Sequence, residues 1–133
     1  MREASVTVTE DRILPDRDAE GKVTVSLERL SKLPTAFACN CDVTAYVLLN
    51  ALKENGIRVP EDVSVVGFDD YILADLAVPS LTTYAIDVDH MAKVSAQQLI
   101  RRIQKPEAEV RRIVVSGKLV IRESVQKHSG NTA

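Results

Sequence analysis

Residues 59–70 read VPEDVSVVGFDD and residues 79–83 read PSLTT, and these two stretches decide the fold. The first combines a turn, a β-branched run typical of a buried strand, and two carboxylates, Asp69 and Asp70, where the strand stops. The second begins another short extended segment. In open α/β sheets, small ligands bind outside the carboxyl ends of the strands. Asp69 and Asp70 are therefore expected where a ligand would lie.

A further strand and a helix precede this stretch. Residues 36–39 read AFAC, a short apolar run after Pro34 that is typical of a buried parallel strand. Asp42 is predicted to be the N-cap of the next helix. A helical apolar stripe then runs up to Asn55 and Gly56, and it consists of Ala45, Leu48, Leu49 and Leu52. Strand, helix and strand in this order predict a βαβ unit with parallel neighbouring strands, because such crossovers are right-handed.

Weaker patterns complete the chain. Residues 81–86 are expected to be extended, and Asp87 or Asp89 to cap a second helix that Pro106 ends. One face of that helix would carry Ala92, Ser95, Ala96, Leu99 and Ile103. A last extended region, with Gly117 permitting a bend, is predicted from the alternation of Ile113, Val115, Leu119 and Ile121.

We divide the chain into residues 1–33, 34–125 and 126–133. The first segment holds only short alternations, at Val6 and Val8 and at Val23 and Val25, and a short helix after Ser26. The second carries the strands and helices described above. The third is a polar tail that we expect to be disordered. The predicted fold class is α/β, with a mainly parallel open sheet and flanking helices.

Composition narrows the class of protein. The 133 residues suit one domain, and 45% hydrophobic with 27% charged residues is ordinary for a globular protein. A net charge of -2 gives no electrostatic footprint for nucleic acid. No apolar stretch approaches the roughly 20 residues of a membrane span, and no signal segment opens the chain. We therefore expect a cytoplasmic protein without membrane contact, and two cysteines so close together in sequence fit a reducing compartment.

The order and spacing of these motifs closely resemble the C-terminal part of the effector-binding domain of LacI/GalR-type transcriptional regulators, which share the periplasmic-binding-protein fold. The resemblance covers roughly residues 34–125: PTAF at 34–37, GIRVPEDVSVVGFDD at 56–70, PSLTT at 79–83 and LVIRES at 119–124. In that family, two lobes close on a sugar or related metabolite and so alter the spacing of paired DNA readers. The resemblance implies half of such a sensing domain, with DNA contacted only through a helix-turn-helix domain absent from this chain.

The resemblance also implies a site. Asp69 would anchor the effector, because a carboxylate accepts hydrogen bonds from adjacent sugar hydroxyls. The alternative is that Asp69 caps the following turn. Cys41 stands where many members have a ligand-contacting asparagine, which suggests a less polar effector at that point. Asp70 would line the same cleft. Homodimer contacts are expected where family members pair, although core packing is the alternative, at Tyr46, Leu73, Leu76 and Ala77.

Two other functions stay open. One is a solute-binding module of a sugar transport system, with the same fold. The other is an α/β enzyme that holds Mg²⁺ through carboxylates at the ends of strands or segments, and its ligands would come from Asp42, Asp69, Asp70 and Asp87. No glycine-rich phosphate loop accompanies these carboxylates, which disfavours the enzyme.

A thiolate metal pair at Cys39 and Cys41 is also disfavoured. A closed zinc site needs about four ligands, and the only histidines, His90 and His128, are remote. We therefore expect a non-enzymatic sensing domain with no cofactor and no metal.

Overall fold

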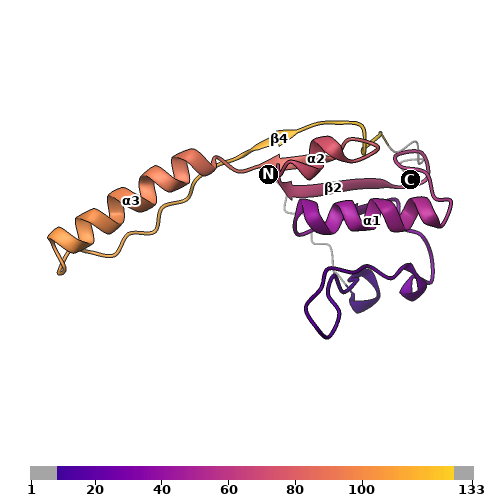
Figure 1. Cartoon of the computed structure of the whole chain (residues 1–133), viewed down its shortest axis with the longest axis horizontal. Helices are drawn as coiled ribbons and strands as arrows, with labels where there is room; N and C mark the ends of the chain where they lie inside the picture. The colour runs from indigo at the N-terminus through magenta and orange to yellow at the C-terminus, as the bar shows by residue number, and fades with distance from the viewer. Residues whose placement is uncertain (1–8, 128–133) are drawn as a thin grey trace.

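A four-stranded sheet forms the centre of the computed structural model, which describes residues 9–127 (Figure 1). The strands lie in the order β1, β2, β3, β4, with bounds Ala36–Ala38, Ser64–Asp69, Thr82–Ala85 and Lys118–Val120. β1, β2 and β3 are parallel, and β4 runs antiparallel to β3. The helices are α1 (Asp42–Glu54), α2 (Leu73–Leu76) and α3 (Val88–Gln104), with short 3-10 turns at Glu10–Arg12 and Leu27–Arg29. The predicted α/β fold with a mainly parallel sheet is confirmed.

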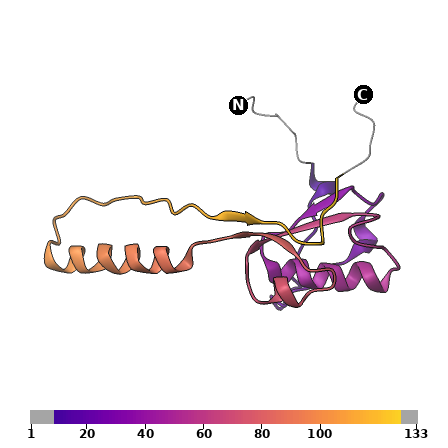
Figure 2. The same cartoon turned by 90° about the horizontal axis from the view of Figure 1, so that it is seen from above.

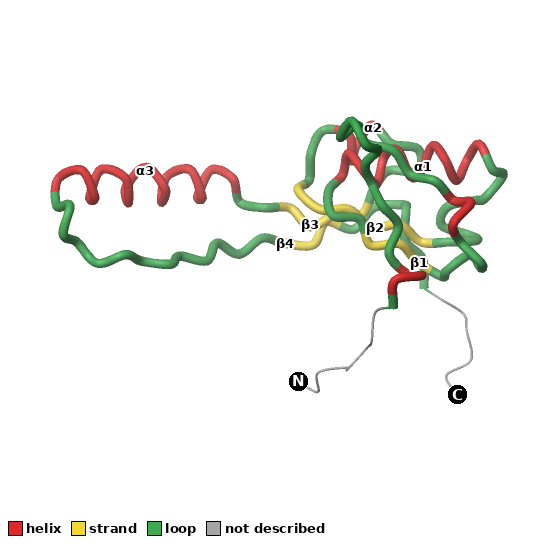
Figure 3. The backbone as a smooth tube through the Cα atoms, turned by 90° about the horizontal axis from the view of Figure 1, so that it is seen from below, coloured by secondary structure: helices red, strands yellow, loops and turns green. Residues whose placement is uncertain are grey.

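The core lies between the sheet and α1, with α2 on the same face (Figure 3). Leu52, Val65 and Leu81 are each 0% exposed. The apolar stripe predicted for α1 is buried along its whole length, because its period matches the helix and the sheet offers a continuous apolar surface. The core comprises Ala45, Leu48, Leu49, Leu52, Val63, Val65, Ala74, Ala77 and Leu81.

Of the two caps predicted for α1, the structure confirms the one at the C-terminal end and contradicts the one at the N-terminal end. Gly56 follows the helix with φ of +71°, as expected for a left-handed C′ glycine. The N-cap prediction is wrong, because Cys41 is the extended N-cap residue and Asp42 is the first residue of the helix. The Asp42 side chain is turned into the fold instead, where a hydroxyl and a backbone N–H donate to it.

Residues 87–117 form an arm that projects from the sheet, with α3 running outward and the following segment returning beside it (Figure 2). Asp87 is the N-cap of α3 and accepts a 2.9 Å hydrogen bond from the His90 backbone N–H, which confirms one of the two predicted caps. No residue of α3 is buried, so the apolar face predicted for this helix is uncovered within the described chain. Leu99 and Ile103, on that face, are 62% and 70% exposed.

The last extended region is shorter than predicted. Only Lys118–Val120 pairs as β4, while Ile113 and Val115 lie in the returning segment and Ile121 follows the strand. Strand pairing needs a partner, and β3 is only four residues long. Gly117 is required by close approach, because a Cβ there would collide with the Ala85 carbonyl oxygen.

The outer segments are partly described. Val6, Val8 and His128 lie outside the described residues. Val23 forms an isolated antiparallel bridge, and Ser26 precedes the Leu27–Arg29 turn without a side-chain cap bond. Gln126, predicted to begin the tail, bonds to the body instead, since its backbone N–H donates to the Ser64 hydroxyl at 3.2 Å. Within residues 9–127, none of the helices has the length and apolarity to cross a membrane.

Candidate functional site

Parallel strands bring the predicted site residues to one edge of the sheet. Asn40 and Cys41 follow β1, and Asp69 ends β2 with Asp70 directly after it. The exposed Asp69 carboxylate takes part in no hydrogen bond among the described residues. It is therefore open to a hydrogen-bond donor from outside this part of the chain.

The backbone at this edge is strained. The backbone φ angles of Asp69 and Asp70 are 110° and 57°, and residues other than glycine rarely adopt such positive values. Such residues persist only where their surroundings hold them, and they gather at binding sites. Residues 69–71, which we term the 69–71 turn, are held through two backbone N–H groups. Asp70 donates to the Thr83 hydroxyl at 3.4 Å, and Tyr71 donates to the Asp42 carboxylate at 2.7 Å.

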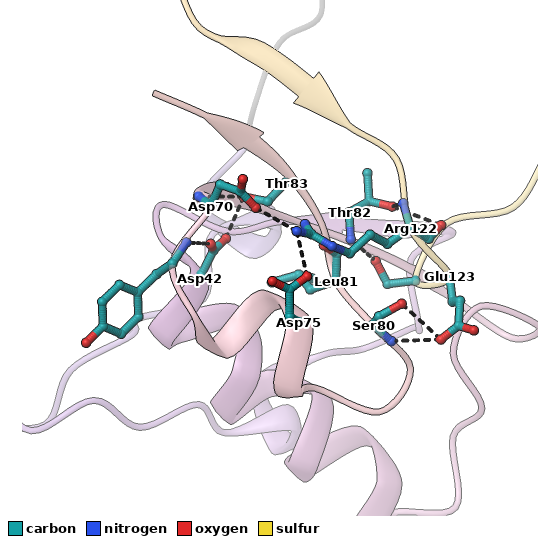
Figure 4. A network of polar contacts seen from close by, with 11 residues as sticks. Asp42, Asp70, Asp75, Ser80, Leu81, Thr82, Thr83, Arg122 and Glu123 are labelled. Carbon is teal, nitrogen blue, oxygen red and sulfur yellow. Dashed lines mark hydrogen bonds and ion pairs between the residues drawn. The ribbon is translucent and has the colours of Figure 1, made fainter. Parts of the chain in front are cut away.

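Asp42 lies beneath the 69–71 turn. Its side chain is 0% exposed and accepts a 2.6 Å hydrogen bond from the Thr83 hydroxyl (Figure 4). Gly67 makes room for it, because a Cβ at that position would collide with the Asp42 carboxylate. The buried carboxylate thus joins α1, β3 and the turn, a role that the sequence pattern did not reveal.

The electrostatics of Asp69 favour a ligand that donates hydrogen bonds. Partial burial, followed by the negative charge of Asp42, raises the pKa of the Asp69 carboxyl above its usual range. A hydroxyl or amine placed against this carboxylate would relieve the cost of its ionisation. An anion placed there would add to that cost.

Asp70 is engaged differently from the prediction. Its carboxylate lies 2.9 Å from the Arg122 guanidinium, which also contacts Asp75 at 2.7 Å (Figure 4). Arg122 donates further to the Leu81 carbonyl at 3.0 Å, and its side chain is only 16% exposed. Sequence reasoning used Arg122 only as part of a motif. The available signal for this partly buried ion pair was an arginine at the end of the apolar run Leu119, Val120 and Ile121.

Cys41 lies in a small polar cluster. Its Sγ is 3.4 Å from the Thr44 hydroxyl, which donates to Asp16 at 3.2 Å. The Asn40 side-chain amide donates to the same Asp16 oxygen at 2.9 Å and, as the main cause, lowers the pKa of that carboxyl. The N-terminal segment therefore contacts the residues that follow β1 through Asp16. Asp16, which sequence analysis did not single out, borders the site.

The metal alternatives find no support among residues 9–127. No group of three or more His, Cys, Asp or Glu side chains gathers there as metal ligands would. Asp87 caps α3, and Asp42 is occupied by Thr83 and Tyr71. Cys39 packs against the core, and burial raises the pKa of its thiol to about 12.

The predicted dimer residues divide into two groups. Leu76 is 64% exposed, and Tyr46 and Leu73 are half-buried. Ala77 is 4% exposed and belongs to the core, so its side chain is not available to a partner. Three apolar neighbours of α2 are also exposed, by 57%, 62% and 80%: Tyr71, Ile72 and Val78.

Two open hollows lie at the other end of α1, away from Asp69. One of 340 Å³ is lined by Leu49 and Val59, and one of 550 Å³ by Val25 and Ala51. Neither contains the perturbed carboxylate or the strained turn. The perturbed carboxylate and the strained turn therefore favour the edge at Asp69 over the two hollows as the candidate site.

Comparison with known proteins gives the family. The family model described as a periplasmic binding protein-like domain matches residues 1–125. The HTH-type transcriptional repressor PurR of Vibrio parahaemolyticus is 36% identical over 130 residues, which are 96% of this chain and 39% of that protein. This chain thus spans about two fifths of the length of that repressor.

Solved structures agree with this match. A complex of the transcriptional regulator CelR with cellobiose has 35% identity and a TM-score of 0.69, covering 74% of this chain and 30% of that one. A LacI family regulator from Enterococcus faecium with bound ribose has 32% identity and a TM-score of 0.66, covering 74% and 37%. The chain belongs to the periplasmic binding protein-like domain family, and its relatives there are LacI- and PurR-type repressors.

Proposed function

We propose that this chain is the C-terminal portion of the effector-sensing domain of a LacI-type transcriptional regulator, and that Asp69 anchors the effector. The observation that carries the proposal is the exposed Asp69 carboxylate, free of partners within the described residues and presented by a strained turn. The relatives support it, since they are named as repressors and two similar structures hold cellobiose and ribose.

The effector is a neutral polyhydroxy compound such as a sugar. Its hydroxyls donate to Asp69 and gain from the charge of the carboxylate. Cys41 borders the same edge and offers the ligand a weakly polar surface. Asp70 serves the site through Arg122, because its carboxylate is already paired.

Closure of a second lobe over the effector would change the spacing of DNA-reading domains. The ligand acts by shifting the population between lobe arrangements, as binding energy differs between them. The function is regulatory and not enzymatic. DNA contact belongs to the longer regulator and not to the residues of this chain.

A sugar-binding titration tests the assignment of Asp69. Isothermal titration calorimetry of the full chain with cellobiose, ribose and lactose is expected to give weak binding, since half a cleft covers little of a ligand. Asp69→Asn keeps the shape of the side chain and removes its charge, and it is expected to weaken binding about tenfold or more. Asp89→Asn, which changes an exposed carboxylate on the arm, is the matched control. Equal affinity in wild type and Asp69→Asn would remove Asp69 from the site.

Self-association is the second part of the proposal. The exposed apolar side chains of α2 and its neighbours, with Leu76 at their centre and Tyr46 and Leu73 beside it, would be covered in a homodimer. Leu76→Ser is expected to shift sedimentation equilibrium toward monomer. Leu99→Ser is the control, because Leu99 is similarly exposed but lies on the arm. A monomeric wild-type chain, or dimers weakened only by Leu99→Ser, would contradict this interface.

A further inference from the structure

Arg122 joins parts of the chain that are distant in sequence. Its side chain contacts Asp70 after β2, Asp75 in α2 and the Leu81 carbonyl before β3 (Figure 4). Asp70 lies 52 residues from Arg122 in the sequence. A single guanidinium therefore ties the loop after β2 to the start of β3.

The contact matters because the 69–71 turn is strained. A positive φ is unfavourable for residues other than glycine, and two such residues follow each other here. The backbone N–H of Asp70 has only a long 3.4 Å hydrogen bond to Thr83. The ion pair with Arg122, at 2.9 Å, is the shorter of the two contacts and is charge-assisted.

Arg122 is itself firmly placed. Its backbone N–H donates to the Thr82 hydroxyl at 2.9 Å, and that hydroxyl donates back to the Arg122 carbonyl at 3.2 Å. Its neighbours are fixed as well, because Glu123 accepts from the Ser80 N–H and the buried Ser124 hydroxyl donates to the Val65 carbonyl at 2.6 Å. The guanidinium thus acts from a rigid base on the 69–71 turn, whose other close anchor is the 2.7 Å hydrogen bond from the Tyr71 N–H to Asp42.

We propose that Arg122 is a positioning residue that holds the 69–71 turn in the left-handed conformation presenting Asp69, an inference whose functional meaning rests on the proposed effector site.

Amide hydrogen exchange of the full chain, measured by NMR without ligand, tests the positioning role. The Tyr71 N–H reports on the turn because it is bonded to Asp42, and the Ala74 N–H reports on the following loop through its 2.7 Å bond to the Tyr71 carbonyl. In Arg122→Gln, exchange at both amides is expected to be about tenfold faster or more, since a charged anchor of the loop is lost. Exchange at Leu48 and Leu52 in α1 is expected to be unchanged.

Arg58→Gln is the matched control. Arg58 is also paired with an aspartate, Asp62, at 2.7 Å, but near the amino end of β2. This variant is expected to speed exchange at Asp62 and Val63, whose N–H groups bond to the Arg58 carbonyl, and not at Tyr71. Acceleration at Tyr71 by Arg58→Gln as large as by Arg122→Gln would overturn the proposal.

Arg122→Lys separates positioning from general stability. Lysine keeps the charge but lacks the planar fork, so it cannot serve all three acceptors together. Exchange at Tyr71 and Ala74 is expected to lie between wild type and Arg122→Gln. If Arg122→Gln speeds exchange at every amide alike, Arg122→Lys decides whether Arg122 positions the turn or only stabilises the whole fold. Faster exchange confined to the turn and loop supports the proposal, and wild-type or uniformly faster exchange overturns it.

The sugar titrations keep this inference distinct from the proposed function. Faster Tyr71 exchange in the Arg122 variants, with no sugar bound by wild type, would leave the positioning role standing and remove the effector site. In the opposite case, sugar binding is lost in Asp69→Asn but Tyr71 exchange is unchanged in folded Arg122→Gln. This result would support the effector site and show that Arg122 does not position the turn.

Discussion

The Thr83 hydroxyl donates a 2.6 Å hydrogen bond to the Asp42 carboxylate, and both side chains are 0% exposed. The bond joins β3 to the first residue of α1, where the helix dipole also favours a negative charge. The same carboxylate accepts from Tyr71 and so supports the 69–71 turn. One buried aspartate therefore links the core to the edge that presents Asp69.

Thr83→Val is expected to lower the free energy of unfolding by about 1–3 kcal/mol, because it leaves a buried carboxylate oxygen without its donor. Urea denaturation followed by circular dichroism measures the change. Thr24→Val, at an exposed threonine, is the control and is expected to stay within about 0.5 kcal/mol. Equal losses in the two variants would contradict the role of the Thr83 hydroxyl.

Asp69→Asn is expected to raise the melting temperature at neutral pH. The pKa of Asp69 is raised in the folded chain, by burial first and then by Asp42, so its ionisation opposes folding. The associated stability is complete below the usual aspartate pKa and is lost as pH rises through the folded value. The gain in the variant should therefore vanish in acid. A lower melting temperature than wild type at pH 7 would contradict the prediction.

The pair between Arg58 and Asp62 predicts an acid-sensitive turn. Hydrogen bonds from the Arg58 side chain, then from its backbone N–H, lower the pKa of Asp62 to about 2. A depressed carboxyl pKa stabilises the fold above the usual aspartate value, and this contribution is lost as pH falls from about 4 to about 2. Asp62→Asn is expected to flatten the fall of the urea midpoint in that window.

Arg58→Gln should also flatten the fall of the urea midpoint between about pH 4 and pH 2, because this variant removes the partner of Asp62. If wild type and both variants lose stability in parallel between these pH values, the pair does not contribute.

Cys39 is expected to be unreactive while the chain is folded. Burial raises the pKa of Cys39 to about 12, so its thiol stays protonated and unreactive at neutral pH. In Cys41→Ser, iodoacetamide labelling at pH 8 should be slow in the folded chain and fast after denaturation. Rapid labelling of the folded variant would show that Cys39 is not held in the core as described.

The sequence predicted those structural features that depend on residues close together along the chain. The stripe of α1, the strand predicted within residues 59–70, the Gly56 turn and the Asp87 cap are all local patterns, and the structure confirms them, with the strand at Ser64–Asp69. The predicted N-cap at Asp42 failed for the opposite reason. Thr83 competes for its carboxylate, and no local pattern shows a partner 41 residues away.

The candidate site divides in the same way. Asp69 and Asp70 were placed correctly at the end of a strand, because a strand that stops at paired carboxylates is visible in the sequence. Three features were not visible: their left-handed backbone, the pairing of Asp70 with Arg122, and the hydrogen bonds from Asn40 and Thr44 to Asp16. Each depends on segments that meet only after the chain has folded.

Hydrophobic periodicity by itself determined that this chain forms parallel strands with a helix packed across them, because burial of one face requires only the right spacing of residues. Tertiary structure alone decided which carboxylates are buried, paired or free among residues 9–127, and within that range it left the apolar face of α3 uncovered. The physical reason is that the charge state and exposure of a side chain depend on what packs against it. For Asp42, Asp69 and Asp70, those neighbours come from distant parts of the chain.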